Sequence, residues 1–247
     1  MLPIFCTVAL VVAATLVILK LNQRAQTTAT THRTPWGLSQ VAVINIQLRY
    51  QRWVTVFALG LLALLYVVNP SNFAAFVGVG NPAAPAKAVA LLGISPGESW
   101  LTVGTNLSLV ITLATTTFMV LQFRKRGLRI RHIRPFILYV LLFSLTNSFA
   151  EEVIYRLGVI IPLYGNIDTA YMLAISAIAF GVPHLRGMPN GLVGATMAGI
   201  LGWVLAKSVV ETHGLVWAWT IHFLQDIVIF TGLVLNAVQI EGRGPQA

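Results

Sequence analysis

The stretch Ala150-Glu151-Glu152-Val153-Ile154-Tyr155-Arg156 decides how this chain folds, because it puts charge where the surrounding sequence is apolar. Two of only seven acidic residues in a chain of 247 lie here, side by side. The apolar run around them extends over residues 135–161, which is long enough to cross a membrane. An ionisable side chain inside a membrane-spanning helix is costly, and it indicates a functional site by default.

Helical spacing separates the two carboxylates. Glu152 and Arg156 are four residues apart with the carboxylate first, which is the favourable order for an ion pair on a helix. Glu151 points about 100° away from Glu152, since an α-helix has about 3.6 residues per turn. We therefore expect Arg156 to neutralise Glu152 while Glu151 faces another partner. The alternative is a structural ion pair beside an uninvolved Glu151.

Composition places the chain in a membrane. Hydrophobic residues make up 57% of it and charged residues 9%, whereas a soluble domain carries about 25% charged residues. The formal net charge of +9 does not indicate a nucleic-acid partner, because the basic residues flank apolar runs as they do in membrane proteins. The single cysteine, Cys6, excludes an intrachain disulfide and a thiolate metal cluster.

The apolar runs predict an all-α, polytopic membrane helix bundle of about seven transmembrane helices. The predicted spans cover residues 2–19, 53–68, 100–123, 135–161, 170–184, 191–206 and 214–236. Residues 41–50 are predicted as a short surface helix. Residues 71–99 are predicted as re-entrant or surface-lying structure, because Asn and Pro interrupt them. Small residues four apart in the sixth span, such as Ala195 and Gly199, predict close packing against another helix.

Two basic segments predict the orientation in the cell membrane. Residues 20–52 and 124–134 hold five and six of the 16 Lys and Arg residues, and neither segment contains an acid. Basic loops stay on the cytoplasmic side. Two predicted spans separate the segments, so both fit the cytoplasmic side and the N-terminus is expected to face outward.

Ionisable residues also lie in two later spans. Phe180 and His184 share a helical face, and Pro183 removes a helix donor just before the imidazole. His222 and Asp226 are four apart, so the carboxylate is expected to lie close enough to orient the imidazole. Three helices that each carry such groups in lipid predict one common cavity where these groups face one another.

The chemistry that these residues support is narrow. A carboxylate and a neutral imidazole can activate water as general bases, and a second imidazole can donate to an oxyanion. Two His and a Glu, namely Glu151, His184 and His222, form the alternative of a zinc site with an open position. The sequence contains no His-Glu-x-x-His helix and no serine or cysteine placed beside a histidine as a nucleophile. Water activation is therefore the natural hypothesis.

Three motifs occur in order on successive helices. They are Glu-Glu-x-x-x-Arg at residues 151–156, Phe-x-x-x-His at 180–184 and His-x-x-x-Asp at 222–226. In these motifs the chain resembles the CPBP family, which includes type II CAAX prenyl endopeptidases and bacteriocin-processing or immunity-related Abi proteins. The resemblance covers a predicted catalytic bundle of residues 95–236. An N-terminal membrane region, residues 1–94, and a polar tail, residues 237–247, lie outside it.

The resemblance implies an intramembrane endopeptidase of the glutamate type. Glu151 would activate water, His184 would help to hold that water, and Phe180 would line the site. His222 and Asp226 would form the oxyanion hole, supported by the ion pair of Glu152 with Arg156. No cofactor is expected, with zinc at Glu151, His184 and His222 as the minority option.

The expected partners are membrane lipid and a peptide or membrane-protein substrate, either lipidated or not.

Asp226 departs from the Asn that is common in the family, and an ionised Asp cannot donate to an oxyanion. Two non-enzymatic readings stay open, an immunity or scaffold protein of this fold and a proton-coupled transporter.

Overall fold

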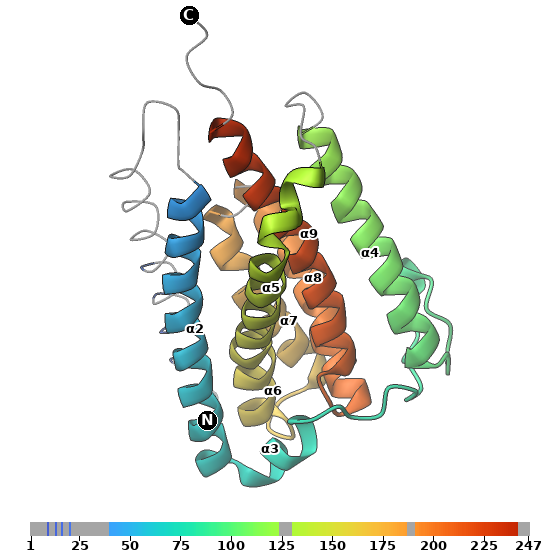
Figure 1. Cartoon of the computed structure of the whole chain (residues 1–247). Coiled ribbons are helices and arrows are strands. Elements are labelled where there is room, and N and C mark those ends of the chain that lie inside the picture. The colour runs from blue at the N-terminus through green and yellow to red at the C-terminus, as the bar shows by residue number, and fades with distance from the viewer. Residues whose placement is uncertain are drawn as a thin grey trace, which may run out of the picture.

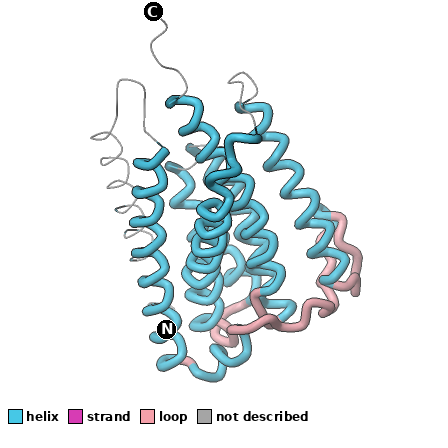
Figure 2. The backbone as a smooth tube through the Cα atoms, in the orientation of Figure 1, coloured by secondary structure: helices cyan, strands magenta, loops and turns pink. Residues whose placement is uncertain are grey.

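The computed structural model describes residues 40–123, 130–186 and 191–241, together with four single residues before them. These residues are almost entirely helical, and no strand occurs among them beyond two isolated bridges. Figures 1 and 2 show the long helices running alongside one another, with the longest loop at one end of the bundle. The predicted class, an all-α membrane helix bundle, is confirmed, and the protein is a multi-pass membrane protein.

In the part of the chain that the structure describes, five helical segments are long and apolar enough to cross a membrane. The α-helices are α2 (Gln40–Val68), α3 (Pro70–Phe76), α4 (Trp100–Phe123), α5 (Ile137–Glu152), α6 (Gly158–Leu163), α7 (Thr169–Gly181), α8 (Gly191–Thr212) and α9 (Val216–Glu241). Helices α5 and α6 are joined by the π-helix η4 (Val153–Leu157) and act as one span over Ile133–Leu163. The predicted span at residues 2–19 lies outside the described ranges, apart from single residues.

Two predicted elements differ from the structure. The predicted surface helix at 41–50 and the predicted span at 53–68 form one continuous helix, α2, because neither Pro nor Gly interrupts the first 20 residues of that segment. The predicted span at 170–184 is shorter than expected. Its helix, α7, has 13 residues and gives way at Val182 to a 3₁₀ turn, η5 (Val182–Arg186), that contains Pro183. The spans predicted at 100–123 and 135–161 agree within two residues with α4 and with Ile133–Leu163, whereas α8 ends at Thr212 and α9 at Glu241, beyond the predicted limits of 206 and 236.

The segment between α3 and α4 does not cross the bundle, as predicted. It contains one 3₁₀ turn, η1 (Ala90–Leu92), and is otherwise a loop held against α8. The buried Lys207 pairs with Glu211 and donates from Nζ to the carbonyl of Lys87 at 2.9 Å. Trp100 Nε1 donates to Glu211 Oε2 at 2.9 Å. These contacts fix the start of α4 and the loop against α8.

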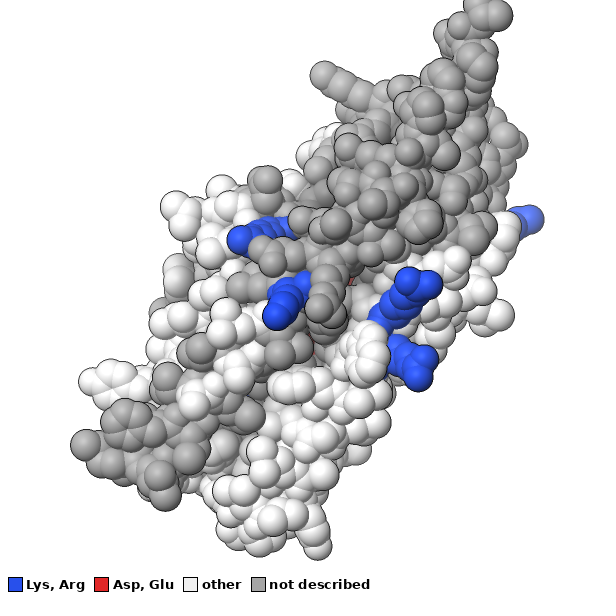
Figure 3. Space-filling view, turned by 90° about the vertical axis from the view of Figure 1, so that its left-hand side faces the viewer, with Lys and Arg blue, Asp and Glu red and all other residues white. Residues whose placement is uncertain are grey.

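The packing of the helices brings the site together. Helix α5 packs between α2 and α9, α4 packs against α9, and α7 packs against α8. The start of α2 and the end of α4 lie at the same end of the bundle (Figure 1), which agrees with one common side for the two basic segments. In Figure 3 the charged side chains visible on one face are almost all Lys and Arg. Which side of the membrane this end faces stays a prediction.

Candidate active site

The two glutamates stand at the C-terminal end of α5, where the helix changes its pitch. Glu151 and Glu152 are the last residues of α5, and the five residues that follow them form η4. Every residue of that π-turn is buried. Such turns inside α-helices are rare and occur frequently at functional sites.

Glu152 and Arg156 form the ion pair that their spacing predicts. Arg156 Nε lies 3.1 Å from Glu152 Oε2, and neither side chain is meaningfully exposed. The guanidinium carbon lies 4.2 Å from the centre of the Phe180 ring, so the aromatic face provides a second partner for the cation. A buried charge pair of this kind needs both partners, since either one alone would be an uncompensated charge.

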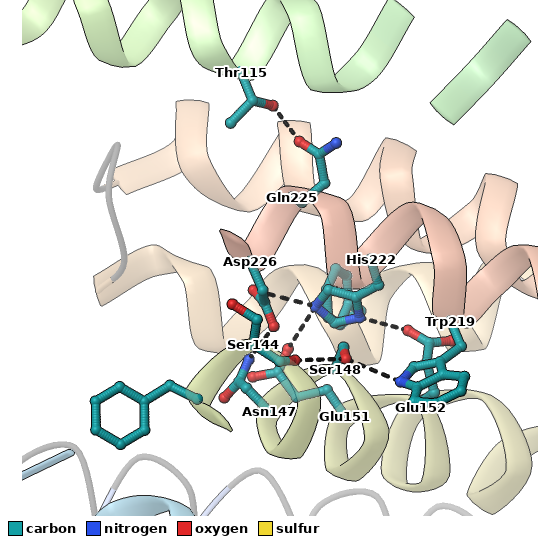
Figure 4. A network of polar contacts seen from close by, with 12 residues as sticks. Thr115, Ser144, Asn147, Ser148, Glu151, Glu152, Trp219, His222, Gln225 and Asp226 are labelled. Atoms are coloured by element: carbon teal, nitrogen blue, oxygen red, sulfur yellow. Dashed lines mark hydrogen bonds and ion pairs between the residues drawn. The ribbon is translucent and has the colours of Figure 1, made fainter. Parts of the chain in front are cut away.

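His222 on α9 lies between the two glutamates (Figure 4). Its Nδ1 is 2.6 Å from Glu152 Oε1, and its Nε2 is 3.4 Å from Glu151 Oε2. Nδ1 carries the proton of the shorter contact if Glu152 is the ionised partner of Arg156, because a carboxylate only accepts. Glu152 therefore forms an ion pair with Arg156 and a hydrogen bond with His222, and Glu151 faces the other nitrogen of the same ring.

Asp226 does not take the place expected for it. Its Oδ1 lies 3.8 Å from His222 Nε2, which is beyond hydrogen-bond distance, so Glu152 orients the imidazole instead. Asp226 Oδ2 accepts from Asn147 Nδ2 at 3.1 Å. The difference arises because α5 crosses α9 at this level, which brings a carboxylate from another helix closer to the ring than the one on its own helix.

Asn147 and Gln51 are site residues that the sequence reasoning missed. Gln51 Nε2 donates to Asn147 Oδ1 at 3.1 Å, and both side chains are buried. The spacing of Asn147, one helical turn before Glu151, is a signal that could have found it. Gln51 gave no usable signal, because it was assigned to the basic segment before the span at 53–68.

His184 joins this group through Phe180. The His184 Nδ1 lies 2.7 Å from the Phe180 carbonyl oxygen. A carbonyl only accepts, so Nδ1 carries a proton and Nε2 of the neutral ring has a free lone pair. The Phe180 ring lies 4.7 Å from the ring of His184 and 5.4 Å, edge to face, from that of His222. The predicted site residues on α5, α7 and α9 are thus linked in one buried cluster, with the half-buried His184 of η5 at its edge.

The described residues do not assemble the alternative zinc site. Within the described ranges, no group of three or more His, Cys, Asp and Glu residues is arranged to hold a metal ion. Glu151 and His222 face each other, whereas His184 is turned to its own helix by the bond to Phe180. The donor set of Glu151, His184 and His222 therefore does not fit a zinc ion as it stands, and no catalytic step is derived through one.

Fold and site together define a helical membrane protein with a buried cluster of carboxylates and imidazoles. Residues 133–228 match the model of the family described as type II CAAX prenyl endopeptidase Rce1-like, which is a family of proteases. The resemblance to the CPBP and CAAX proteases is confirmed over these residues, a shorter stretch than the predicted 95–236. No curated protein and no solved structure matches the chain.

Proposed function

We propose that this protein is an intramembrane endopeptidase of the glutamate type that activates water with Glu151. The observation that carries the proposal is the facing pair of Glu151 Oε2 and His222 Nε2, 3.4 Å apart. Glu151 retains an exposed fraction of 9%, whereas Glu152 has 0% and is engaged by Arg156 and His222. Of the two glutamates, Glu151 is therefore the one that a water and a substrate can reach.

The hydrolysis follows from these roles. Glu151 takes a proton from water, and the water oxygen forms a bond to the carbonyl carbon of the scissile peptide. The carbonyl oxygen becomes an oxyanion, which His222 stabilises from Nε2. That donation requires a proton on both ring nitrogens, because Nδ1 donates to Glu152. The C–N bond then breaks, and the proton held by Glu151 passes to the leaving nitrogen.

The other cluster residues support this step. His184, with the free lone pair on Nε2, helps to hold the water, and Phe180 packs against both imidazoles. Glu152 orients His222, and Arg156 neutralises Glu152. Asp226 lies near Nε2 of His222, the same nitrogen that Glu151 faces. The reaction needs no cofactor.

The substrate class follows from the position of the site. The cluster lies in the apolar part of the bundle, so the scissile bond belongs to a membrane protein or to a peptide held at the membrane. The matching family consists of prenyl endopeptidases, and a lipidated peptide is one member of this class.

A reconstitution experiment tests the function. The purified chain in proteoliposomes receives a mixed library of plain and prenylated peptides, and mass spectrometry identifies new peptide ends. We expect cleavage products that are absent from empty vesicles. Vesicles that carry protons across the membrane in response to a pH gradient, without any product, would favour the transporter instead, and a folded protein that does neither would favour the scaffold.

Metal removal is a separate prediction. Cleavage is expected to continue at the same rate after dialysis against a chelator, because the proposed water activation uses side chains of the protein and no metal ion. The measurement is the initial rate before and after dialysis, with a rate after added zinc as the control. Loss of cleavage on chelation and recovery with zinc would reject the glutamate mechanism in favour of the metal option.

A further inference from the structure

A chain of buried hydrogen bonds runs from α2 to Asp226. Gln51 Nε2 donates to Asn147 Oδ1 at 3.1 Å, and Asn147 Nδ2 donates to Asp226 Oδ2 at 3.1 Å. All three side chains are buried. Gln51 lies on α2, outside the residues that match the family, so the chain connects the site to a part of the protein that the family match does not cover.

The direction of this chain follows from the orientation of its two amides. Gln51 presents its amino group to Asn147 and its Oε1 to Thr146 Oγ1 at 3.0 Å, a hydroxyl that also lies 2.8 Å from the carbonyl oxygen of Leu142. An amide has one acceptor end and one donor end, so Asn147 then presents its amino group to Asp226. An amino group only donates, and Asp226 Oδ2 must accept. With both amides turned the other way, Asp226 would need a proton on Oδ2 to donate to Asn147.

Asp226 needs such a donor because of its surroundings. Burial opposes a negative charge on Asp226, and so do Glu151 and Glu152 on α5, whereas His222, whose Nε2 lies 3.8 Å from Asp226 Oδ1, favours it. Tyr50, on α2, also lies within electrostatic reach of Asp226. A hydrogen bond to a charged group is stronger than one between neutral groups, so the Asn147 donor acts selectively on the ionised form.

We propose that Gln51 is a positioning residue that, through Asn147, holds Asp226 as a carboxylate with Oδ1 turned toward His222. The inference rests on the proposed function for its catalytic meaning, but the protonation of Asp226 can be measured without any cleavage. It also accounts for the departure at this position. The family commonly has Asn, which is neutral, whereas an ionised Asp in the same place needs the donor that α2 and α5 supply.

The composition of the chain allows a direct measurement. Only two aspartates occur in the sequence, Asp168 and Asp226. Asp168 is exposed and caps α7 by accepting from the backbone N–H of Ala170 at 2.7 Å. Asn caps helices as well as Asp does, so Asp168→Asn gives a parent protein in which Asp226 is the single aspartate. Cell-free synthesis with carbon-13 in the aspartate carboxyl then isolates its infrared band.

The full chain in proteoliposomes is titrated in this parent and in three variants. The parent is expected to show the carboxylate band at pH 7. In Asn147→Leu, the pH at which the acid band reaches half its intensity is expected to rise by about one unit or more, the effect of losing a hydrogen bond to a charged group. Gln51→Leu is expected to shift it in the same direction by less, because Asn147 is still present but no longer oriented.

Thr115→Val is the matched control. Thr115 on α4 donates to Gln225, the neighbour of Asp226 on α9, so the variant removes a side-chain contact with the same helix but not with Asp226. It is expected to leave the titration of Asp226 unchanged. Size-exclusion chromatography checks the fold of each variant, and Gln51→Met, closer in shape to Gln, replaces Gln51→Leu if the latter does not fold.

Each outcome decides the proposal. An acid band already present in the parent at pH 7, or a Gln51 variant that titrates like the parent, overturns it. Equal shifts in all three variants overturn it as well, because they would reflect a general change of the bundle. The expected shifts in a protein that cleaves nothing would support the positioning of Asp226 and refute the proposed peptidase, so the two failures are distinguishable.

Discussion

At the scale of single residues, Glu151 and Glu152 are neighbours in the sequence with different surroundings. Glu152 is shared by Arg156 at 3.1 Å and His222 at 2.6 Å, whereas Glu151 meets only Nε2 of the same imidazole at a longer distance. Adjacent carboxylates on one helix therefore divide into one that holds the site together and one that is available for chemistry.

Replacement of Glu152 tests this division. Glu152→Gln leaves a buried Arg156 without its carboxylate, and breaking a buried pair costs about 3–5 kcal/mol. We expect a clear loss of thermal stability, measured by circular dichroism in detergent. Glu98→Gln, a change of the same chemistry in a partly exposed loop residue, is the control and should unfold with the parent. Parent-like stability of Glu152→Gln would contradict the structural role of the pair.

Asp226 gives a second prediction at this scale. Asn can still accept from Asn147, so Asp226→Asn is expected to keep most of the cleavage activity, whereas Asp226→Ala can neither accept nor donate. We expect Asp226→Ala to lose activity on the order of 10²–10³-fold, the scale for one oxyanion-hole group, because His222 then lacks the oxygen that faces its Nε2. The measurement is the initial rate of cleavage by folded protein. If Asp226→Asn proves as inactive as Asp226→Ala, the position requires a negative charge.

The residue pairs show what spacing can predict. The contact of Glu152 with Arg156 lies within one helix, so four-residue spacing was sufficient to find it. The contact of Glu152 with His222 joins residues 70 apart, and it depends on how α5 crosses α9. The same spacing rule correctly placed Asp226 near His222, at 3.8 Å, but it could not show that Glu152 from another helix lies closer, at 2.6 Å.

At the scale of helices, the close contact of α7 with α8 depends on glycine. A Cβ built on Gly181 would lie 2.7 Å from the backbone oxygen of Ala195, whereas one on Gly199 would lie 3.5 Å from that of Ala177. The small residues that were expected to allow close packing on α8 do meet another helix, and Gly202 contacts Phe180 in the site.

These distances predict opposite results for two similar substitutions. Gly181→Ala forces α7 and α8 apart and is expected to destabilise the bundle by about 1–3 kcal/mol, the usual cost of overpacking. Gly199→Ala makes an ordinary contact and is expected to be neutral or slightly stabilising, since Ala favours a helix over Gly. Thermal unfolding of both variants measures the difference. Equal effects would show that the two helices adjust freely to an added methyl group.

Helix limits were predictable where the sequence contains a break. Asn69-Pro70 correctly marked the end of α2, whereas the predicted span at 170–184 ran past the end of α7 at Gly181 and past Pro183. The start of α2 was wrong because residues 41–50, with Arg49, were assigned to a separate surface helix and the span was begun only after Arg52. Both arginines are exposed on a continuous helix, where long basic side chains can reach polar surroundings. The misplaced start also concealed Gln51.

At the scale of the whole molecule, the charge pattern predicts the orientation in the membrane. Single cysteines at Ser95 and Lys125, each in a Cys6→Ser background, can be treated with an impermeant thiol reagent on intact cells. We expect labelling of Ser95→Cys from outside and of Lys125→Cys only after the cells are opened. Labelling of Lys125→Cys from outside would reverse the predicted topology.

The order of the spans and their common bundle were predictable because each apolar run is long and bounded by polar residues. The assembly of the site was predictable only in outline. Buried ionisable groups on three helices had to meet, but the way in which they meet depends on helix crossings that no single segment encodes.

The most direct test of the central claim is the rate of peptide cleavage by Glu151→Gln in proteoliposomes. Gln has the same shape as Glu but cannot accept a proton from water, so we expect a folded protein whose cleavage rate falls by about 10²–10⁴-fold, the contribution of a general base. Glu98→Gln should cleave at the parent rate. A folded Glu151→Gln protein that also cleaves at the parent rate would contradict the assignment of Glu151 as the base.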